Sequence, residues 1–214
     1  MQPPLGPADL PSGVRLFPLP GVLLLPRAVL PLNIFEPRYL QMVRDAMAGD
    51  RMIAMIQPRN DSEPWELFDV GCVGRITQYS ETGDGRYLIA LTGVSRFRLG
   101  RELAVDTPYR QAEADFAPFS VDLDSDASLA AAQRADLESS LRHYLSLNDM
   151  SADWDAVSAA DDESLVNTLA TVCPFTPAER QAILEAPALP GRAATLSALM
   201  RLSEGNGDSA AVLQ

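Results

Sequence analysis

The sequence predicts an α+β protein in which a small mixed β-barrel with an inserted helix is followed by an α-helical bundle. Two observations carry this prediction. Residues 14–116 contain six or seven short segments rich in β-branched and aromatic residues, with one helical segment among them. Near residue 118 the apolar residues change to a spacing of three and four, which is the period of a helix. Short strands of this kind lose their exposed edges by closing into a barrel.

The chain opens with a Pro/Gly-rich leader at residues 1–13, which we expect to be mobile. Four prolines then interrupt the apolar run that follows, so no long helix can form there. Strands are predicted at 14–19 and 28–32. A helix is predicted at 37–48, because Pro37 suits the first helical position and apolar residues recur at helical spacing after it.

The rest of the predicted barrel consists of strands with clear turn signals. The strands are expected at residues 51–57, 70–79, 86–92, 94–103 and 110–116. Asp84-Gly85 marks a tight hairpin between the second and third of them. Gly93 is expected to break the chain between the third and fourth. The last strand alternates apolar and polar residues, which predicts one buried face and one wet face.

The second half reads as helices. An acidic linker, Asp122 to Asp126, is expected to be solvated and to supply the cap of a helix that runs to Leu147. Residues 148–160 are predicted to be a polar loop around Trp154. Further helices are predicted at 161–172, 176–185 and up to 201. The predicted organisation is therefore a leader at 1–13, a barrel at 14–117, a helical bundle at 118–202 and a disordered tail at 203–214.

Composition and charge exclude several classes of function. All 17 basic residues are arginine, so the 214 residues contain no Walker lysine, Ser–Lys dyad or Schiff-base lysine. The net charge is −12, and all of it comes from residues 111–214, which hold 17 acidic residues and 5 arginines. Such a charge repels nucleic acid and anionic membranes.

The expected location is the cytoplasm. No basic segment precedes the first apolar run, as a signal peptide would require, and prolines interrupt that run. No apolar stretch is long enough to span a membrane. The two cysteines, Cys72 and Cys173, lie in apolar surroundings and are expected to be buried thiols, although the sequence does not rule out a disulfide between them.

Candidate catalytic and metal-binding residues are few. The one histidine, His143, has no second ligand at metal spacing and is expected to be an ordinary helix residue. Asp122, Asp124 and Asp126 alternate as in part of a calcium loop, but Ala127 stands where that loop needs glycine. We therefore expect no catalytic residues, no cofactor and no metal.

Two charged groups could belong to a binding surface. Glu36 and Arg38 stand at the turn into the first helix, where they either line a ligand rim or serve as a cap and an ion-pair partner. Arg96 and Arg98 flank Phe97 on a strand and could form a small basic face. Three alternating residues are weak support for RNA binding, and the overall charge opposes it.

Several segments resemble the Lon substrate-binding domain, which is the N-terminal domain of the Lon protease family and occurs also in cereblon and as a free-standing bacterial protein. The opening motif comprises Leu16-Phe17-Pro18-Leu19, Leu30-Pro31-Leu32 and Ile34-Phe35-Glu36-Pro37-Arg38-Tyr39. The later matches are Gly71-Cys72-Val73-Gly74-Arg75-Ile76, Leu91-Thr92-Gly93-Val94-Ser95-Arg96-Phe97-Arg98-Leu99 and the tract from Pro174 to Leu196. The resemblance covers most of residues 14–202.

This resemblance implies a PUA-like barrel followed by a helical bundle. It also implies a non-catalytic module that binds unfolded or damaged polypeptides. A protease is a second expected partner. The residues expected at the peptide-binding surface are Phe35, Glu36, Arg38, Tyr39, Arg96 and Phe97. The three aromatic residues among them also fit the hydrophobic core. The alternatives are an RNA-binding PUA-like module and a small-ligand-binding protein. The sequence leaves self-association open.

Overall fold

The computed structural model describes residues 6–60, 62–124 and 128–202, and the chain divides into two compact units, Met1–Ser125 and Asp126–Gln214. Each unit is described by itself. The division falls after the predicted boundary at 117/118, because a short 3-10 helix, η2 (Ala117–Leu123), belongs with the barrel. Within the described ranges, no helix is both long enough and apolar enough to cross a membrane.

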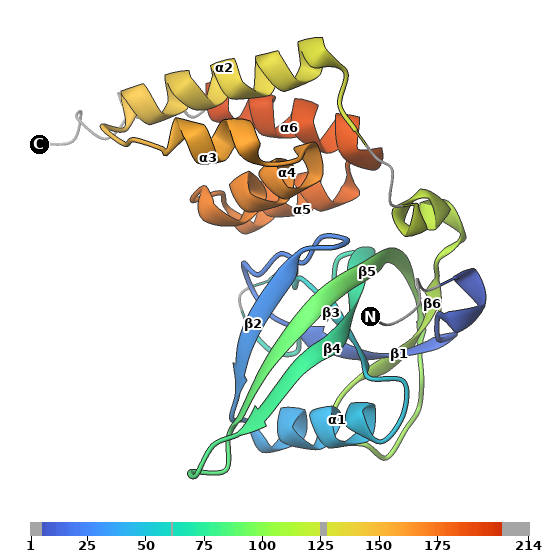
Figure 1. Ribbon diagram of the computed structural model, residues 1–214. Helices are drawn as coiled ribbons and strands as arrows, with labels where there is room; N and C mark the ends of the chain where they lie inside the picture. Colours follow the sequence, from blue (N-terminus) through green and yellow to red (C-terminus); the bar gives the residue numbers. More distant parts are fainter. Residues whose placement is uncertain (1–5, 61, 125–127, 203–214) are drawn as a thin grey trace, which may run out of the picture. The chain divides into compact units, whose positions relative to one another are not determined.

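Six strands form the first unit: β1 (Gly13–Pro18), β2 (Val29–Ile34), β3 (Met52–Ile56), β4 (Val70–Glu81), β5 (Tyr87–Glu102) and β6 (Gln111–Asp115). Five of them close into a ring in the order β5-β4-β3-β1-β6, because β6 pairs with both β1 and β5. Only the β1–β3 pair is parallel among these pairings. The sixth strand, β2, lies outside the ring, and within the part of the chain that the structure describes it pairs with β5 alone (Figure 1). The predicted mixed barrel is confirmed.

β5 is one long strand, so the predicted break at Gly93 is wrong. Its first half pairs with β2 and its second half with β6, while β4 follows it on the other edge. Position 93 requires glycine because a neighbouring backbone leaves no room for a side chain. A Cβ there would lie 2.0 Å from the carbonyl oxygen of Leu25, a separation that no side chain tolerates. The glycine therefore admits the backbone of the β1–β2 connection and does not end the strand.

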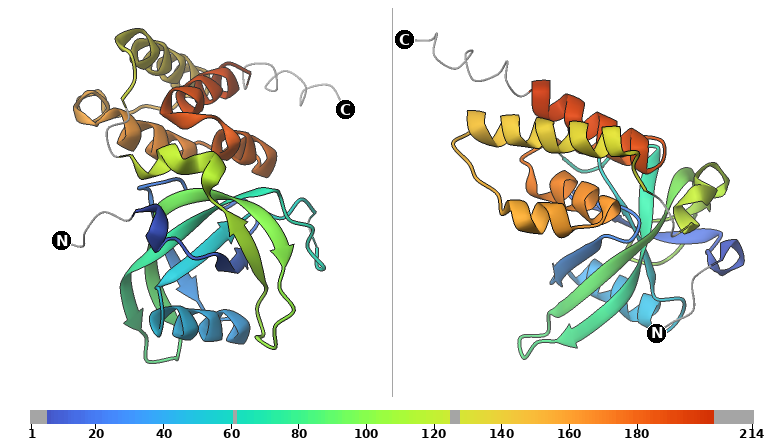
Figure 2. Two further views of the ribbon diagram at one scale, coloured as in Figure 1. Left: turned by 90° about the vertical axis from the view of Figure 1, so that its right-hand side faces the viewer. Right: turned by 45° about the horizontal axis from the view of Figure 1, so that its top comes forward.

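The barrel interior is filled by alternate residues of the strands, as the pleat requires. Its buried members are Val14, Leu16, Met52, Ala54, Ile56, Leu67, Val73, Phe97 and Ala112. Helix α1 (Pro37–Met47) starts at a proline, as predicted, and buries Tyr39, Met42, Val43 and Ala46. Figures 1 and 2 show α1 lying across one end of the barrel.

The acidic linker differs from its prediction as a solvated segment. Asp122 is 1% exposed and accepts hydrogen bonds from the backbone N–H, Nε and Nη2 of Arg96, at 3.0, 2.8 and 2.8 Å. The ring of Phe119 covers the same guanidinium at 4.7 Å. Asp122 also does not cap the next helix. Its ion pair with Arg96 fastens η2 to the barrel wall.

The leader at 1–13 is described from residue 6 onward. Pro7–Asp9 form a single 3-10 turn, η1, and Leu10 packs against the barrel core. This part of the predicted leader is therefore ordered structure. Residues 1–5 and the predicted tail at 203–214 lie outside the described residues.

The second unit is a helical bundle built around its last helix. Its helices are α2 (Ala131–Leu147), α3 (Trp154–Ala159), α4 (Asp162–Val172), α5 (Pro177–Glu185) and α6 (Ala188–Leu202). α6 packs against α2, α4 and α5, and Figure 2 shows it beside α2. The buried apolar side chains include Leu137, Leu141, Val166, Ile183, Leu196 and Met200.

Most helix boundaries agree with the sequence signals. Thr176 and Glu179 form the expected capping box at the start of α5. The polar loop at 148–160 was predicted without α3, which has no buried residue and is capped by the carboxylate of Asp153. Cys72 and Cys173 are free, buried thiols, one in each unit.

Candidate functional site

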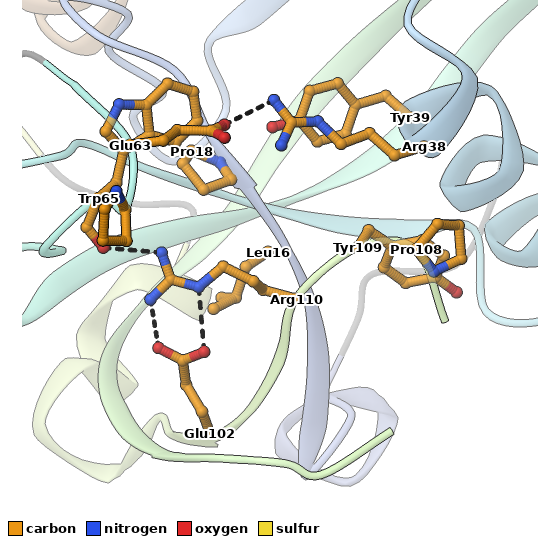
Figure 3. A pocket seen from close by; sticks show the side chains of 11 residues that line it. Leu16, Pro18, Arg38, Tyr39, Glu63, Trp65, Glu102, Pro108, Tyr109 and Arg110 are labelled. Atoms are coloured by element: carbon orange, nitrogen blue, oxygen red, sulfur yellow. Dashed lines mark hydrogen bonds and ion pairs between the residues drawn. The ribbon is translucent and has the colours of Figure 1, made fainter. Parts of the chain in front are cut away.

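One pocket of about 390 Å³ opens on the barrel unit beside the start of α1, and we name it the Tyr39 pocket. It is lined by Leu16, Pro18, Arg38, Tyr39, Glu63, Pro64, Trp65, Glu102, Pro108, Tyr109 and Arg110. These residues come from β1, α1, the loop between β3 and β4, the last residue of β5, and the segment that joins β5 to β6. Figure 3 shows the side chains converging from these segments. Aromatic rings and prolines form much of the wall, with two arginines among them.

Arg38 lies on one side of the pocket, held by two carboxylates. Its Nη2 is 2.7 Å from the carboxylate of Glu63 and 3.0 Å from that of Glu36. Its guanidinium carbon lies 4.7 Å from the centre of the Tyr39 ring and 5.8 Å from that of Trp65. These contacts combine ion pairing with cation–π attraction. Of the two sequence interpretations of Glu36 and Arg38, the ion pair is confirmed. Glu36 occupies the N-cap position of α1, but its side chain makes no capping hydrogen bond.

Arg110 occupies the other side of the pocket. Its guanidinium pairs with both carboxylate oxygens of Glu102, with Nε 3.0 Å from Oε2, and its Nη1 donates to the carbonyl of Trp65 at 2.9 Å. Figure 3 shows these three bonds. Because a bidentate pair fixes the plane of the guanidinium, Arg110 is a rigid part of the wall.

The charges around the pocket compensate one another. The hydrogen bond from Arg38 to Glu63 raises the pKa of Arg38, and the hydrogen bond from Arg110 lowers the pKa of Glu102.

Burial raises the pKa of Tyr39 to about 12, and burial together with the hydrogen bond to Asp45 raises that of Tyr109 to about 12. Both phenols therefore stay protonated at neutral pH. No histidine or cysteine is among the described residues that line the pocket.

A second hollow lies on the three-stranded part of the sheet, β2-β5-β4, and we name it the sheet groove. It measures about 630 Å³ and is lined by Pro31, Leu32, Asn33, Gln78, Tyr79, Ser80, Leu88, Ile89 and Ala90. The register places Pro31 and Gln78 on either side of Ala90, and Asn33 and Ser80 on either side of Leu88. Side chains paired in this way share a face of the sheet. The nine lining residues carry no charge.

The two faces of this three-stranded region differ in exposure, except that Ala90 on the groove face is 5% exposed and Tyr79 on the opposite face is 41% exposed. On one face, Ile34, Tyr87, Ile89 and Leu91 are at most 4% exposed. On the groove face, Leu88 is 47% exposed and Val29, two residues before Pro31 on the same strand, is 62% exposed. Large apolar side chains that remain exposed together on a sheet mark an interaction surface.

The residues predicted for the peptide surface separate into three places. Glu36, Arg38 and Tyr39 gather at the Tyr39 pocket. Phe35 follows directly after β2, is 60% exposed and lies 5.8 Å from the guanidinium carbon of Arg86. Tyr39 is only 4% exposed and packs on Phe17 at 4.3 Å between ring centres.

Arg96 and Phe97 do not belong to any surface, which corrects their prediction. Phe97 is fully buried in the barrel core, and Arg96 is 2% exposed because it pairs with Asp122. The small basic face of Arg96 and Arg98 therefore does not form. Sequence reasoning missed Leu88 and Val29 because single apolar residues in strands are usually buried. It missed Trp65 because that residue lies in a loop without periodicity.

The remaining candidates are His143 and the aspartates of the acidic linker, of which Asp126 lies outside the described residues. His143 is exposed on α2. Among the described residues, no group of three or more histidine, cysteine, aspartate or glutamate side chains is arranged to hold a metal ion.

Comparison with known proteins is consistent with this architecture. The family model of the ATP-dependent protease La (LON) substrate-binding domain matches residues 13–201. "Lon protease 2" of Syntrophobacter fumaroxidans is 27% identical over 184 residues, which are 83% of this chain and 23% of that protein. "Lon protease 2" of Myxococcus xanthus is 29% identical over 54% of this chain and 14% of its own length. The chain thus spans less than a quarter of the curated relatives it matches.

Two solved structures share the fold. The Lon N-terminal domain protein from Xanthomonas campestris superposes with a TM-score of 0.62 at 23% identity, over 91% of this chain and 98% of that one. The N-terminal domain of the Mycobacterium avium complex Lon protease also gives 0.62, at 16% identity, over 88% and 98%. The α+β fold predicted from the sequence is confirmed.

Proposed function

We propose a function from one premise: the chain belongs to the ATP-dependent protease La (LON) substrate-binding domain family. On this premise the protein binds exposed apolar segments of unfolded or damaged polypeptides and does so without catalysing a reaction. The binding surface is the sheet groove. The proposed setting is the cytoplasm, with a protease as the partner that receives the bound polypeptide.

The observation that carries the proposal is the partly exposed sheet groove on β2, β5 and β4. Val29 and Leu88 stand out from it with 62% and 47% of their surface exposed, and the nine residues that line the hollow carry no charge. A polypeptide segment with several apolar side chains would bury this surface, and the free energy would come from the apolar area removed from water. The serine, asparagine and glutamine side chains between them can satisfy the polar backbone of such a segment.

The geometry of β2 favours recognition without sequence specificity. Among the described strands β2 pairs only with β5, so its other edge offers backbone groups to an extended segment. Pro31 removes one backbone donor from this strand. The edge therefore supports weak pairing and opposes a long, permanent β-ladder, which suits a protein that must release what it binds.

The test is the fluorescence anisotropy of a labelled, permanently unfolded polypeptide titrated with the full chain. Saturable binding in the micromolar range that changes little with salt is expected, since an apolar contact is not screened. Leu88→Gln should weaken binding about fivefold, because roughly 1 kcal/mol of apolar burial is lost.

Leu147→Gln is the matched control, because Leu147 is also a half-exposed leucine, at 53%, but lies in the helical unit. It should leave the affinity unchanged, and thermal unfolding should show that both variants are folded. Equal affinities for the wild type and Leu88→Gln would remove the sheet groove from the proposal. No binding up to about a millimolar would remove the proposed function itself.

A further inference from the structure

Four residues around Arg38 form a site of their own, which we name the guanidinium box: Glu36, Tyr39, Glu63 and Trp65. Two rings face the guanidinium, 4.7 and 5.8 Å from its central carbon, and two carboxylates pair with it at 2.7 and 3.0 Å. Figure 3 shows the Arg38 side chain between the Tyr39 ring and Glu63. Flat aromatic faces with carboxylates beside them are the chemistry that recognises a guanidinium group. Inside this chain, the group that the box holds is Arg38.

The contacts of Arg38 contribute little to its stability in this position, although they are numerous. It is the second residue of α1, where the positive end of the helix dipole disfavours a cation. Its side chain is 35% exposed, and those of Glu36 and Glu63 are 42% and 51% exposed. Ion pairs with this exposure contribute little to stability, so an exchange of partners costs little.

We propose that the guanidinium box binds an arginine side chain of a captured polypeptide, which takes the place of Arg38. This inference rests on the proposed function and names the class of segment that it favours: segments with arginine as well as apolar residues. The barrel unit, residues 1–125, holds 16 acidic residues and 12 arginines, and this net charge of −4 favours basic segments. Arginine is favoured over lysine, because a planar guanidinium can stack on the two rings and pair with a carboxylate at the same time.

The peptide experiment compares two labelled peptides that differ at one position. One contains apolar residues and a single arginine, and the other has citrulline, which has the same shape without the charge. The arginine peptide should bind about fivefold more tightly to the wild type. Arg38→Gln empties the box and should widen this difference, while Glu63→Gln should abolish it.

Matched control variants come from a second ion pair on the same unit. Arg101 and Glu113 pair at 2.8 Å on the surface, with 78% and 51% of their side chains exposed. Arg101→Gln and Glu113→Gln should leave the difference between the two peptides at its wild-type value. Thermal unfolding of all four variants checks that each is folded.

A second readout does not depend on peptide capture. The chain has two tryptophans, so Trp154→Phe leaves Trp65 as the single tryptophan. In this background, Arg38→Gln should show a saturable change of Trp65 fluorescence with N-acetyl-arginine amide and none with the citrulline analogue.

The outcomes separate this inference from the proposed function. If both peptides bind every variant with equal affinity, the proposed function stands and the box is refuted. If Arg38→Gln weakens the arginine peptide selectively, Arg38 itself contacts the peptide and the exchange is refuted. If neither peptide binds the wild type, the proposed function fails, and the fluorescence titration alone tests the guanidinium box. A saturable change of Trp65 fluorescence with the arginine amide would still support arginine binding by the box. No change of fluorescence would refute it.

Discussion

Arg96 and Asp122 lie 26 residues apart in the chain and form a buried, bidentate ion pair, with both side chains at most 2% exposed. The pair joins the middle of β5 to η2, the last element of the barrel unit. The carbonyl of Asp122 also accepts a hydrogen bond from Arg27 at 2.5 Å. The C-terminal end of the barrel unit is thereby bound to the barrel through two residues, Arg96 and Arg27.

Asp122→Ala should destabilise the barrel unit by about 3–5 kcal/mol, because it leaves the charge of Arg96 buried without its partner. Denaturant unfolding followed by Trp65 fluorescence in the Trp154→Phe background measures this loss. Glu113→Ala, which breaks the exposed pair with Arg101, should cost less than about 1 kcal/mol. Similar losses for the two variants would contradict the role assigned to the buried pair.

Tyr39→Ala should act mainly on stability. Tyr39 is 4% exposed and packs on Phe17, so the truncation leaves a cavity and should cost about 3 kcal/mol or more. Tyr39→Phe keeps the ring contact and should be much milder. The same denaturant titrations give both values, and a Tyr39→Ala protein as stable as the wild type would show that the ring is dispensable for packing.

Pro31→Thr should increase self-association through β2. The substitution restores a backbone donor on a strand that pairs on one side only, and threonine favours extended structure. Sedimentation velocity over a range of concentrations measures the change. Asn33→Thr is the matched control, since it adds the same side chain to the same strand without adding a donor. A purely monomeric Pro31→Thr protein would mean that the proline does not protect the edge.

Asp161 should make the stability of the helical unit depend on pH. Its carboxylate accepts a hydrogen bond from the backbone N–H of Ser164 at the start of α4, and hydrogen bonds from Ser164 lower its pKa. A lowered pKa means that the stabilisation is complete above the unfolded value of about 3.9 and is lost as the pH falls through the folded value. Asp161→Ala should therefore cost about 1 kcal/mol at pH 7, and this difference should shrink below about pH 4.

Thermal unfolding of the wild type and Asp161→Ala between pH 7 and pH 3 tests this dependence. Asp155→Ala, at an exposed aspartate of α3 on the same unit, provides the control. A difference in stability between the wild type and Asp161→Ala that stays constant down to pH 3 would show that the carboxylate charge is not what stabilises the cap.

The sequence predicts the elements of this fold better than it predicts their contacts. Proline at the start of α1 and the capping box of α5 are local signals, and both are confirmed. Gly93 was misinterpreted because a glycine that admits a distant backbone looks the same in sequence as one that ends a strand. The short α3 was missed because a helix with no buried residue has no apolar period to detect.

The candidate site shows the same limit. The sequence predicts an ion pair for Arg38 without naming its partners, which the structure shows to be Glu36 and Glu63. The sequence predicts a solvated Asp122, because its partner Arg96 lies 26 residues earlier and long-range pairing leaves no local pattern. The sheet groove could not be predicted, because only the registers of β2 and β4 on β5 place Pro31, Leu88 and Gln78 on one face.

The closure of the barrel has a consequence for synthesis on the ribosome. β1 is the first strand of the chain, and its partners are β3 and β6, the last of which ends at Asp115. The β4–β5 hairpin is local and can form as soon as it leaves the exit tunnel, but the ring stays open until β6 has emerged. We therefore expect a nascent chain that stops before Gln111 to expose the interior of its barrel.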